Sequence, residues 1–542
     1  MKRFYLQRML IICLVILLSA CSTENTYWIP PYAPPTAAPA LAMLPVGSNL
    51  NLEELADPVF EPPLEATQSL PKDEQGEPAP TAETVIIPPT PSAPTSTPEI
   101  ASANTAPILY YAQAADTLPV VAVRFGVQPE EIVSAEPIPE EGFIHPGQLM
   151  VIPRRLGNTT SSQHILPDSE VVYSPSATDF DATTYAEEAG GYLSSFTEWH
   201  KSTGMKPGSE IITRVALENS INPRLLMALL EFHGGWVHGM PASAQLAEYP
   251  MGVFLPIEEN LYNQLVWVVN QLSIGYYDYR EGRLTEIRFK DGVTARLAPD
   301  LNAGTAALQY YFAVRLDSHE WVKALDPETG FPALYEKMFG NPWLRAQNVE
   351  PLFPPGTTQP SLILPFGRNW TWAYTGGPHG AWEKDGAYAA LDFAPGTNES
   401  GCVDSNAWVV AVASGLVVRT GPGLVVIDLD GDGHEQTGWV IVYLHIATRD
   451  RIPLGTWVAT GDKIGHASCE GGFATGTHIH ITRKFNGEWV PADGPVPFNL
   501  GGWIAHAGEA AYLGTMTRDS DTITACTCSN YATFITRTDE DP

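Results

Sequence analysis

Basic side chains are scarce in this chain: its 542 residues include 30 lysines and arginines against 61 aspartates and glutamates. The formal net charge of −31 argues against nucleic acid as a partner and against adhesion to anionic surfaces, because both need positive charge. Cysteine is also rare: there are six, and the four besides Cys13 and Cys21 have a spacing that resembles no thiolate zinc module. After the N-terminal segment, no apolar run reaches the roughly 20 residues of a membrane-spanning helix. The chemistry of the chain is therefore expected in other side chains.

The N-terminal segment is the main long apolar stretch. Three basic residues precede the apolar run 9–18, and the sequence Leu-Ser-Ala-Cys follows and ends at Cys21. This order is typical of a secretory signal, and the last four residues resemble a bacterial lipobox. The resemblance implies that residues 1–20 are a lipoprotein signal peptide and that lipidated Cys21 holds the chain at a membrane. An uncleaved anchor or a plain signal peptide stays open, and in each case we expect an extracytoplasmic protein of the cell envelope.

Two segments have the composition of linkers. Residues 21–106 are dominated by Pro, Thr, Ala, Ser and Glu, and residues 156–183 have a similar character. Such segments bury too little apolar surface to offset the entropy of ordering, so we expect disordered spacers. The first linker would let the folded domains of a membrane-tethered protein contact a cell wall some distance from the membrane.

Residues 107–155 predict a small folded module in the order strand, helix, turn, helix, strand. Three motifs resemble a LysM module: Asp116-Thr117-Leu118, Phe125-Gly126-Val127 and residues 145–153. The resemblance implies a βααβ fold that binds glycans containing N-acetylglucosamine. Ala115 and Glu136 depart from the family pattern, and a purely structural role is the alternative.

Residues 184–350 have helical periodicity, so we expect an all-α domain. Asn222 and Pro223 form a typical helix start, and Gly234-Gly235 a typical stop. The stretch from Asn222 to Trp236 is faintly similar to lysozyme-like lytic transglycosylases, in which a catalytic glutamate follows this helix. Glu231 is either a displaced acid of that kind or a helix-end residue, and the domain is either a glycan-cleaving unit or a substrate-holding spacer.

The C-terminal third contains the strongest chemical signal, four histidines and one aspartate within short motifs. Two histidines and one carboxylate suit an open zinc site, in which three protein ligands leave one position for water. The run 477–482 alternates polar and apolar residues, so His478 and His480 share one face of a strand. The run 439–445 predicts a second strand, with His445 on the face of Tyr443.

These motifs resemble lysostaphin/LytM-type zinc endopeptidases, which cut the peptides of peptidoglycan. The matching segments are 364–367, 413–415, 443–445, 461–465 and 476–480, together with the positions of His379 and Asp392. The resemblance implies an antiparallel all-β domain over residues 358–512, followed by a C-terminal tail at 513–542. It implies that His379, Asp392 and His480 are the zinc ligands, and that His445 and His478 are the catalytic pair.

The chain departs from this family between its first two ligands, which the family keeps a few residues apart. Here residues 380–390 separate them, and Tyr388 stands near the usual position of the histidine. His434, in a hydrophilic turn, is a weaker stand-in for His379.

Four cysteines besides Cys13 and Cys21 allow three disulfide pairings. Cys402 and Cys469 are the preferred pair because both fall in loops of the peptidase-like domain, which leaves Cys526 and Cys528.

Asp428, Asp430 and Asp432 alternate before a glycine, as the first ligands of a short calcium loop do. The glutamate expected at the twelfth position is missing, and an acidic hairpin turn is the alternative.

The sequence therefore predicts a multidomain, secreted, lipid-anchored zinc metalloendopeptidase that hydrolyses peptide cross-links or stems of peptidoglycan. Zinc is the expected cofactor, and the aspartate loop is a candidate site for calcium. The alternative is a non-catalytic wall-binding scaffold or an activator of other cell-wall hydrolases.

Overall fold

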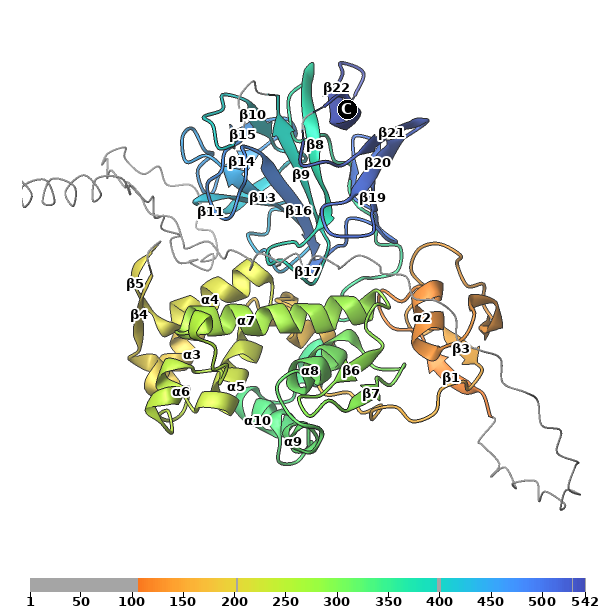
Figure 1. Cartoon of the computed structure of the whole chain (residues 1–542), viewed down its shortest axis with the longest axis vertical. Helices are drawn as coiled ribbons and strands as arrows, with labels where there is room; N and C mark the ends of the chain where they lie inside the picture. The colour runs from red at the N-terminus through yellow and green to blue at the C-terminus, as the bar shows by residue number, and fades with distance from the viewer. Residues whose placement is uncertain (1–105, 201–202, 397–400, 529, 542) are drawn as a thin grey trace, which may run out of the picture.

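The structure is a computed structural model, and it describes residues 106–200, 203–396, 401–528 and 530–541. The predicted signal peptide, Cys21 and the first linker lie outside these residues, apart from Ala106. A small N-terminal module flanks a helical domain, and a C-terminal β domain lies on top of the helices (Figure 1). Among the described residues, none of the helices has both the length and the apolar character needed to cross a bilayer.

The N-terminal module is a small sheet with one α-helix. Its elements are β1 (Ile108–Tyr111), α2 (Leu118–Phe125), a 3-10 turn (Pro129–Glu131), β2 (Val133–Ser134) and β3 (Leu149–Ile152). β3 lies between β1 and β2 and is antiparallel to both. The second predicted helix is therefore only a 3-10 turn, and a short strand follows it.

This module contacts the helical domain through backbone carbonyl groups. Arg296 donates hydrogen bonds to the carbonyl oxygens of Val123 and Arg124 at 3.0 and 3.1 Å. Gln113 donates to the carbonyl oxygen of Asp300 at 2.8 Å. The module is thus packed on its neighbour and is not joined to it by a free spacer.

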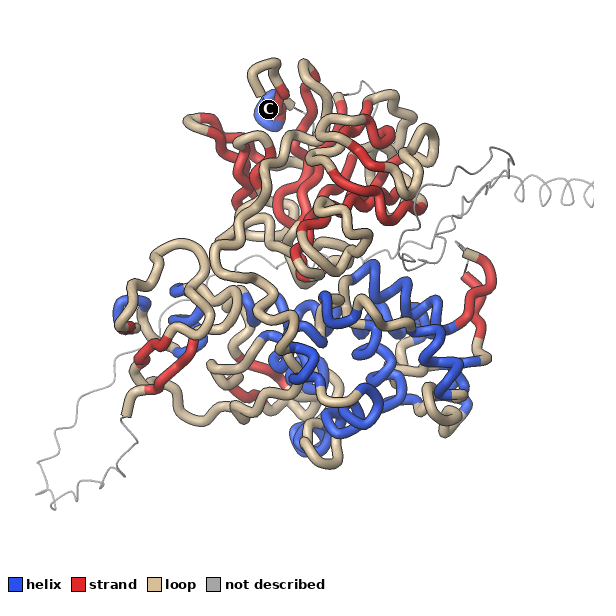
Figure 2. Tube along the Cα trace, turned by 180° about the vertical axis from the view of Figure 1, so that it is seen from behind, coloured by secondary structure: helices blue, strands red, loops and turns tan. Residues whose placement is uncertain are grey.

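The helical domain contains the predicted helices and two small hairpins. The helices are α3 (Ala182–Ala189), α4 (Gly208–Asn219), α5 (Pro223–Gly234), α6 (Ala244–Glu248), α7 (Leu261–Ser273), α8 (Ala303–Ala313), α9 (Ser318–Ala324), α10 (Phe331–Phe339) and α11 (Pro342–Ala346). Asn222 accepts a hydrogen bond from the backbone N–H of Arg224, as expected of a helix cap. The hairpins pair β4 (Thr197–His200) with β5 (Gly204–Pro207), and β6 (Glu286–Arg288) with β7 (Thr294–Arg296). The all-α expectation is therefore wrong in detail, although helices predominate (Figure 2).

The prediction of a linker at residues 156–183 is wrong. Ile165, Leu166 and Val171 are buried in the core of the helical domain. Asp168 accepts hydrogen bonds from the Asn302 side chain and the Gly304 backbone N–H at 2.8 and 2.7 Å. Burial of these apolar side chains stabilises the segment in a folded form, although its overall composition is polar.

The C-terminal domain is an antiparallel β domain, as predicted. Its main sheet has the order β14-β11-β12-β13-β16-β9-β8-β22, with β17 beside β16. In that order the strands are Trp457–Val458, Gly415–Gly421, Gly423–Asp428, Trp439–Ile446, Ile479–Phe485, Ala390–Pro395, Trp370–His379 and Phe534–Arg537, and β17 is Glu488–Trp489. Smaller sheets pair β10 (Trp408–Val410) with β15 (Lys463–His466), and join β18 (Asn499–Leu500), β19 (Trp503–Ala507), β20 (Gly514–Arg518) and β21 (Asp521–Thr524).

The segment 513–542 was expected to be a tail, and this expectation is wrong. It contributes β20 and β21, and β22 pairs with β8 from Phe534 to Arg537. Because β8 would otherwise be an exposed edge, β22 satisfies its backbone hydrogen bonds.

The helical domain and the β domain share one hydrophobic core. Val440, Val442 and Leu444 of β13 belong to the same buried cluster as the helices. Leu444 pairs with His480, so the helices cover the sheet on the face that also carries His480. At the edge of this interface, Trp489 donates a hydrogen bond to the carbonyl oxygen of Asn219 at 3.2 Å. The two domains form one packed body.

A buried ionic cluster lies beside this interface. The Glu435 carboxylate accepts hydrogen bonds from Arg419 and from Lys484, the latter at 3.0 Å, and all three side chains are buried. Burial alone would raise the pKa of Glu435, but the charges of Arg419 and Lys484 lower it to about 2. Glu435 thus balances two buried cations.

We expect acid to remove the stabilisation that Glu435 provides. Because its folded-state pKa lies below the ordinary value of 4.5, the stabilisation is complete above about pH 4.5 and is lost as the pH falls toward about 2. The shift corresponds to about 3 kcal/mol. Glu435→Gln should lower the free energy of unfolding at pH 7, and the gap from wild type should narrow in acid. Urea titrations at several pH values measure this, with exposed Glu188→Gln as a neutral control; a gap that stays constant with pH would contradict it.

Candidate zinc centre

Three strands bring His379, Asp392 and His480 together on one face of the sheet. In β9 and β16, Asp392 and His480 are directly paired. His379 ends β8, where the register shifts on either side of Gly376, so that His379 pairs with Ala390. Because Ala390 and Asp392 are two residues apart on one strand, this irregularity turns His379 to the face of Asp392.

The donor atoms of the three side chains are close to one another. His379 Nε2 lies 3.0 Å from His480 Nδ1 and 3.3 Å from Asp392 Oδ1. His480 Nδ1 lies 3.4 Å from the same Asp392 oxygen. All three residues are buried. Tetrahedral zinc with bonds of about 2.0–2.2 Å separates its ligands by about 3.3–3.6 Å, so the spacing fits this ion.

The hydrogen bonds of the two imidazole rings also fit a metal ion. His379 Nδ1 bonds the Gly377 carbonyl at 2.7 Å, and His480 Nε2 bonds the Ala381 carbonyl at 3.0 Å. A carbonyl can only accept, so each neutral ring has its proton there and turns a lone pair toward the other ring. Among the described residues, buried Asp392 Oδ1 has no hydrogen-bond donor. Two lone pairs and a carboxylate oxygen facing one point require a cation between them.

The pKa values of these groups agree with this requirement. Burial opposes ionisation of Asp392, but the adjacent His379 holds the pKa of this carboxyl well below its usual range. Burial lowers the pKa of His379, yet the Asp392 carboxylate outweighs it and leaves the pKa raised. At His480 burial dominates and the pKa is lowered. A positive charge is thus favoured at the centre of the cluster, beside an ionised aspartate.

Two neighbouring residues shape the space around the ligands. A Cβ atom at Gly376 would lie 2.5 Å from Asp392 Oδ2, so only glycine leaves room for the carboxylate. The Tyr512 ring stacks on His379 with ring centroids 4.1 Å apart. Tyr512 has a φ of +67°, a strained conformation for a non-glycine residue. The prediction from sequence did not include either residue.

His445 and His478 lie beside the three ligands. Their ring centroids are 4.4 Å apart, and His478 Nε2 is 3.9 Å from Asp392 Oδ1. Nδ1 of His445 bonds the Glu470 carbonyl at 2.9 Å, and Nδ1 of His478 bonds the Gly476 carbonyl at 2.7 Å. Both Nε2 atoms therefore keep a lone pair in the neutral rings. Burial, with the nearby charges of His478 and His480, lowers the pKa of His445 to about 3, which keeps this ring neutral at pH 7.

The expected orientation of His445 on the face of Tyr443 is wrong. Tyr443 packs in the opposite core, where its hydroxyl accepts a hydrogen bond from the Val412 N–H at 2.8 Å. His445 has a φ of +62°, which breaks the alternation of the strand and turns its ring toward His478. Strain of this kind is common where a side chain must be held for function.

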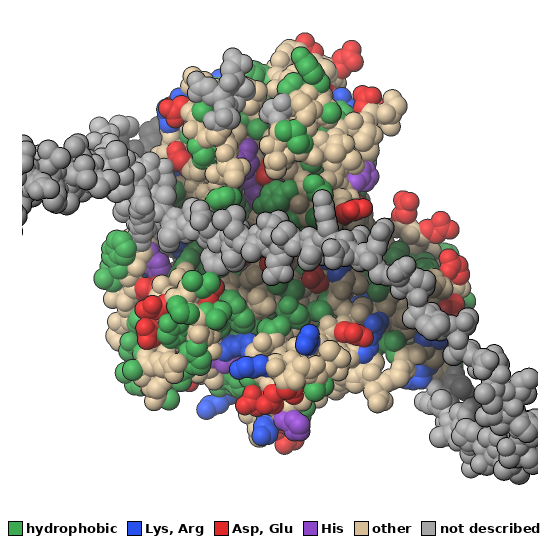
Figure 3. Space-filling view, viewed as in Figure 1, with side chains coloured by type: hydrophobic (Ala, Val, Ile, Leu, Met, Phe, Trp, Pro, Cys, Tyr) green, Lys and Arg blue, Asp and Glu red, His purple; other side chains and the backbone are tan. Residues whose placement is uncertain are grey.

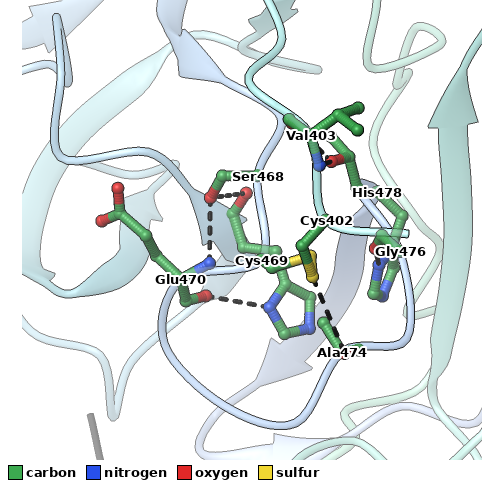
Figure 4. Close-up of a disulfide and its surroundings, with 10 residues drawn as sticks. Cys402, Val403, Ser468, Cys469, Glu470, Ala474, Gly476 and His478 are labelled. Atoms are coloured by element: carbon green, nitrogen blue, oxygen red, sulfur yellow. Dashed lines mark hydrogen bonds between the residues drawn. A yellow bond between two sulfur atoms is a disulfide. The ribbon is translucent and has the colours of Figure 1, made fainter. Parts of the chain in front are cut away.

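A disulfide holds the loops that orient these two histidines. Cys402 and Cys469 are bonded, as preferred from the sequence, and Cys526 is bonded to Cys528. Figure 4 shows the Cys402–Cys469 bond, which joins the segment of Cys402 and Val403 to the loop that carries Glu470, Gly476 and His478. The carbonyl groups that fix the protons of His445 and His478 both come from this loop.

Other residues considered from the sequence lie outside the cluster. His434 lies in the turn with Asp432, whose side chain accepts a hydrogen bond from its N–H at 2.8 Å. The Tyr388 ring lies beneath the guanidinium group of Arg283. Glu231 accepts hydrogen bonds from the backbone N–H groups of Val237 and His238, which is the role of a helix-end residue. His434 is therefore not a stand-in for His379, and Glu231 is engaged in local structure.

The three aspartates of the predicted calcium loop also come together. One carboxylate oxygen each of Asp428, Asp430 and Asp432 lies within 4.8 Å of the others. Asp428 is buried and accepts a hydrogen bond from the Gly433 N–H at 2.8 Å, as in an acidic turn. Calcium binding stays a prediction.

Comparison with known proteins gives a family match to the helical domain and relatives that cover about half of the chain. Residues 164–352 match the family model described as the N-terminal domain of LasA. Protease LasA of Pseudomonas aeruginosa, in two strains, is 26% identical over 309 residues, which covers 52% of this chain and 68% of the relative.

Solved structures give weaker likenesses. The M23 metalloprotease pseudoalterin is 23% identical, over 31% of this chain and 96% of its own, with a TM-score of 0.27. The catalytic domain of lysostaphin from Staphylococcus simulans is 22% identical, over 23% of this chain and 90% of its own, with a TM-score of 0.17. The match at 164–352 gives no support to a lysozyme-like description of the helical region.

His379, Asp392 and His480, on an antiparallel β domain, define a zinc metalloendopeptidase. Together with the match to protease LasA, they make this chain a LasA-like zinc metalloendopeptidase, and the structure brings the three residues predicted as zinc ligands together.

Proposed function

We propose that this enzyme acts outside the cytoplasm on bacterial peptidoglycan and hydrolyses its peptide cross-links or stems. The observation that carries the proposal is the group of three ligand atoms 3.0–3.4 Å apart, beside two histidines that keep free lone pairs. The resemblance to lysostaphin/LytM-type endopeptidases supports the choice of substrate. Two disulfides suit an oxidising compartment.

The proposed mechanism assigns proton transfer to His445 and His478. His379, Asp392 and His480 would hold zinc, which would supply Lewis acidity and would make water a nucleophile near neutral pH. Nε2 of either histidine can accept the proton of the nucleophile, because Nδ1 is already committed to a carbonyl. Once protonated, the same Nε2 donates a hydrogen bond to the negatively charged oxygen of the tetrahedral intermediate, or returns the proton to the leaving amine.

The other predicted parts of the chain fit this proposal as accessories. The module at 107–155 is proposed to contact glycan, as its resemblance to LysM implies. Lipidated Cys21 is proposed to hold the enzyme at the membrane. The scaffold alternative would keep both accessories and dispense with hydrolysis.

Digestion of purified peptidoglycan by the full chain tests the substrate and the bond type together. A peptidase releases new amino groups without new reducing ends, whereas glycan cleavage releases reducing or anhydro-sugar ends. We expect amino groups alone, released in proportion to time and abolished by a chelator. Reducing or anhydro-sugar ends would indicate a glycan-cleaving enzyme, and no release at all, with zinc bound, would favour the scaffold.

A further inference from the structure

The segment that connects the helical domain to the β domain forms one wall of a cavity of about 380 Å³. This wall consists of residues 357–362, and the opposite wall belongs to the segment 495–502. The Gln359 side chain donates a hydrogen bond to the Asn499 carbonyl at 2.8 Å, and the Gly501 N–H donates to the Leu362 carbonyl at 2.8 Å. These bonds hold the walls in place. The volume lies within the range of ligand pockets, about 300–1,000 Å³.

The lining of this cavity is uncharged. Of the described residues that line it, none is acidic or basic, although the chain has 61 acidic residues and Figure 3 shows acidic side chains on both domains. Three prolines, Leu362 and Val496 provide apolar surface, and Thr358 and Ser361 provide hydroxyl groups that can donate hydrogen bonds. Because Thr358 and Ser361 are exposed, the cavity opens to solvent. It offers a ligand both apolar contacts and hydrogen-bond donors.

A buried arginine, Arg483 of β16, lies directly behind the lining. Its guanidinium donates hydrogen bonds to the side-chain oxygen of Gln359 and to the carbonyl oxygens of Val496 and Pro497, the last at 3.1 Å. All three acceptors belong to residues that line the cavity. Arg483 follows His480 by three residues on the same strand, so its side chain is on the opposite face of the sheet from this zinc ligand. The cavity is therefore separate from the zinc centre.

The positive charge of Arg483 has no acidic partner. Among the described residues, its Nε lacks a hydrogen-bond acceptor, and the acceptors of its other nitrogens are all neutral. Burial lowers the pKa of this guanidinium, and no nearby acid offsets the loss of water. The rings of Phe498 and Trp439, with centroids 4.7 and 5.7 Å from Cζ, compensate the charge only in part. By contrast, the two cations of the buried ionic cluster share the Glu435 carboxylate. Arg483 lacks a counter-ion that the cavity has room to hold.

We propose that this cavity binds a small carboxylate with an apolar body and that Arg483 attracts it. The positive charge behind the lining selects an anion, and the hydroxyl groups of Thr358 and Ser361 can donate hydrogen bonds to the carboxylate oxygens. The prolines pack against the apolar part of the ligand. A free carboxylic acid and the C-terminal residue of a peptide share this chemistry. Such a pocket is independent of the zinc site and goes beyond the proposed function.

Isothermal titration of the zinc-loaded full chain tests the proposal with three probes: N-acetylalanine, its neutral amide, and N-acetyl-trialanine with a free carboxylate. We expect N-acetylalanine to bind about 10-fold or more tightly than its amide, because only the acid has a charge that Arg483 attracts. Tighter binding of N-acetyl-trialanine would identify the end of a peptide as the ligand, and tighter binding of N-acetylalanine would identify a free acid. Equal affinities for N-acetylalanine and its amide, or no binding of either acid, would overturn the proposal.

Two substitutions of Arg483 separate its charge from its bulk. Arg483→Met removes the charge and should weaken binding of N-acetylalanine by about 10-fold or more, whereas Arg483→Lys keeps a charge and should retain most of the affinity. Arg449→Met is the control, because Arg449 is exposed and does not line the cavity. All three variants should keep the zinc content of the wild type. A carboxylate bound to zinc instead would bind Arg483→Met as tightly as wild type, and this result would overturn the proposal.

Ser361→Trp covers the case in which Arg483→Met is unfolded by circular dichroism. Because Ser361 is an exposed residue of the lining, the indole ring can occupy the cavity without disturbing the buried core. This variant should lose measurable binding of N-acetylalanine while it keeps its zinc content and its unfolding temperature. Wild-type affinity in a folded Ser361→Trp protein would contradict the proposal.

Discussion

His480→Ala should abolish both zinc binding and peptidoglycan hydrolysis. The substitution removes one of three protein ligands and leaves the Asp392 carboxylate buried, with one fewer partner. Loss of an outer partner typically costs 10- to 100-fold in metal affinity, so loss of a ligand should cost more than about 100-fold. Metal analysis after gel filtration and the release of amino groups from peptidoglycan measure the two effects.

The matched control is His434→Ala, which removes a histidine from a turn outside the site. It should keep stoichiometric zinc and full hydrolysis. Zinc retained by His480→Ala would show that another set of residues binds the ion. Hydrolysis retained without zinc would exclude a metal-dependent mechanism.

His445→Ala should keep zinc and lose most of the rate. The ring lies beside the cluster, but its Nδ1 is held by the Glu470 carbonyl and it is not one of the ligands. Removal of a general acid or base typically lowers kcat by about 10²- to 10⁴-fold. Steady-state kinetics on a defined muropeptide should show this loss in kcat with a small change in KM.

The kcat of His478→Ala, and of the double variant with His445→Ala, shows whether the two histidines act together. If the two histidines act on the same proton, the double variant should lose little more than either single variant, because residues that act as a unit are not additive. Losses that multiply would assign independent roles to the two rings. A His445→Ala enzyme with wild-type kcat would contradict the proposed mechanism.

The ligand set could be predicted from sequence because its members lie in short strands with characteristic neighbours. The alternation of residues 477–482 placed His478 and His480 on one side, and the structure brings both to Asp392. His379 was harder to place, because its orientation depends on the register shift at Gly376 and not on local alternation. A bulge leaves no distinct mark in a single sequence, apart from the glycines that accommodate it.

Other features depend on contacts between distant segments. The burial of Ile165 and Leu166, and the pairing of β22 with β8, follow from tertiary partners that composition cannot reveal. The contact of Ala381 with His480 also required the structure, since Ala381 acts through its carbonyl group and any residue has one. Tyr512 was missed for a similar reason: its position on His379 follows from the path of a loop and not from a motif.

The central claim is that His379, Asp392 and His480 hold one zinc ion. Anomalous diffraction from crystals of the full chain, measured on both sides of the zinc absorption edge, tests it most directly. The account predicts a single strong peak within about 2.0–2.2 Å of His379 Nε2, His480 Nδ1 and Asp392 Oδ1. A peak elsewhere, or a zinc-loaded protein with no peak among these three atoms, would contradict it.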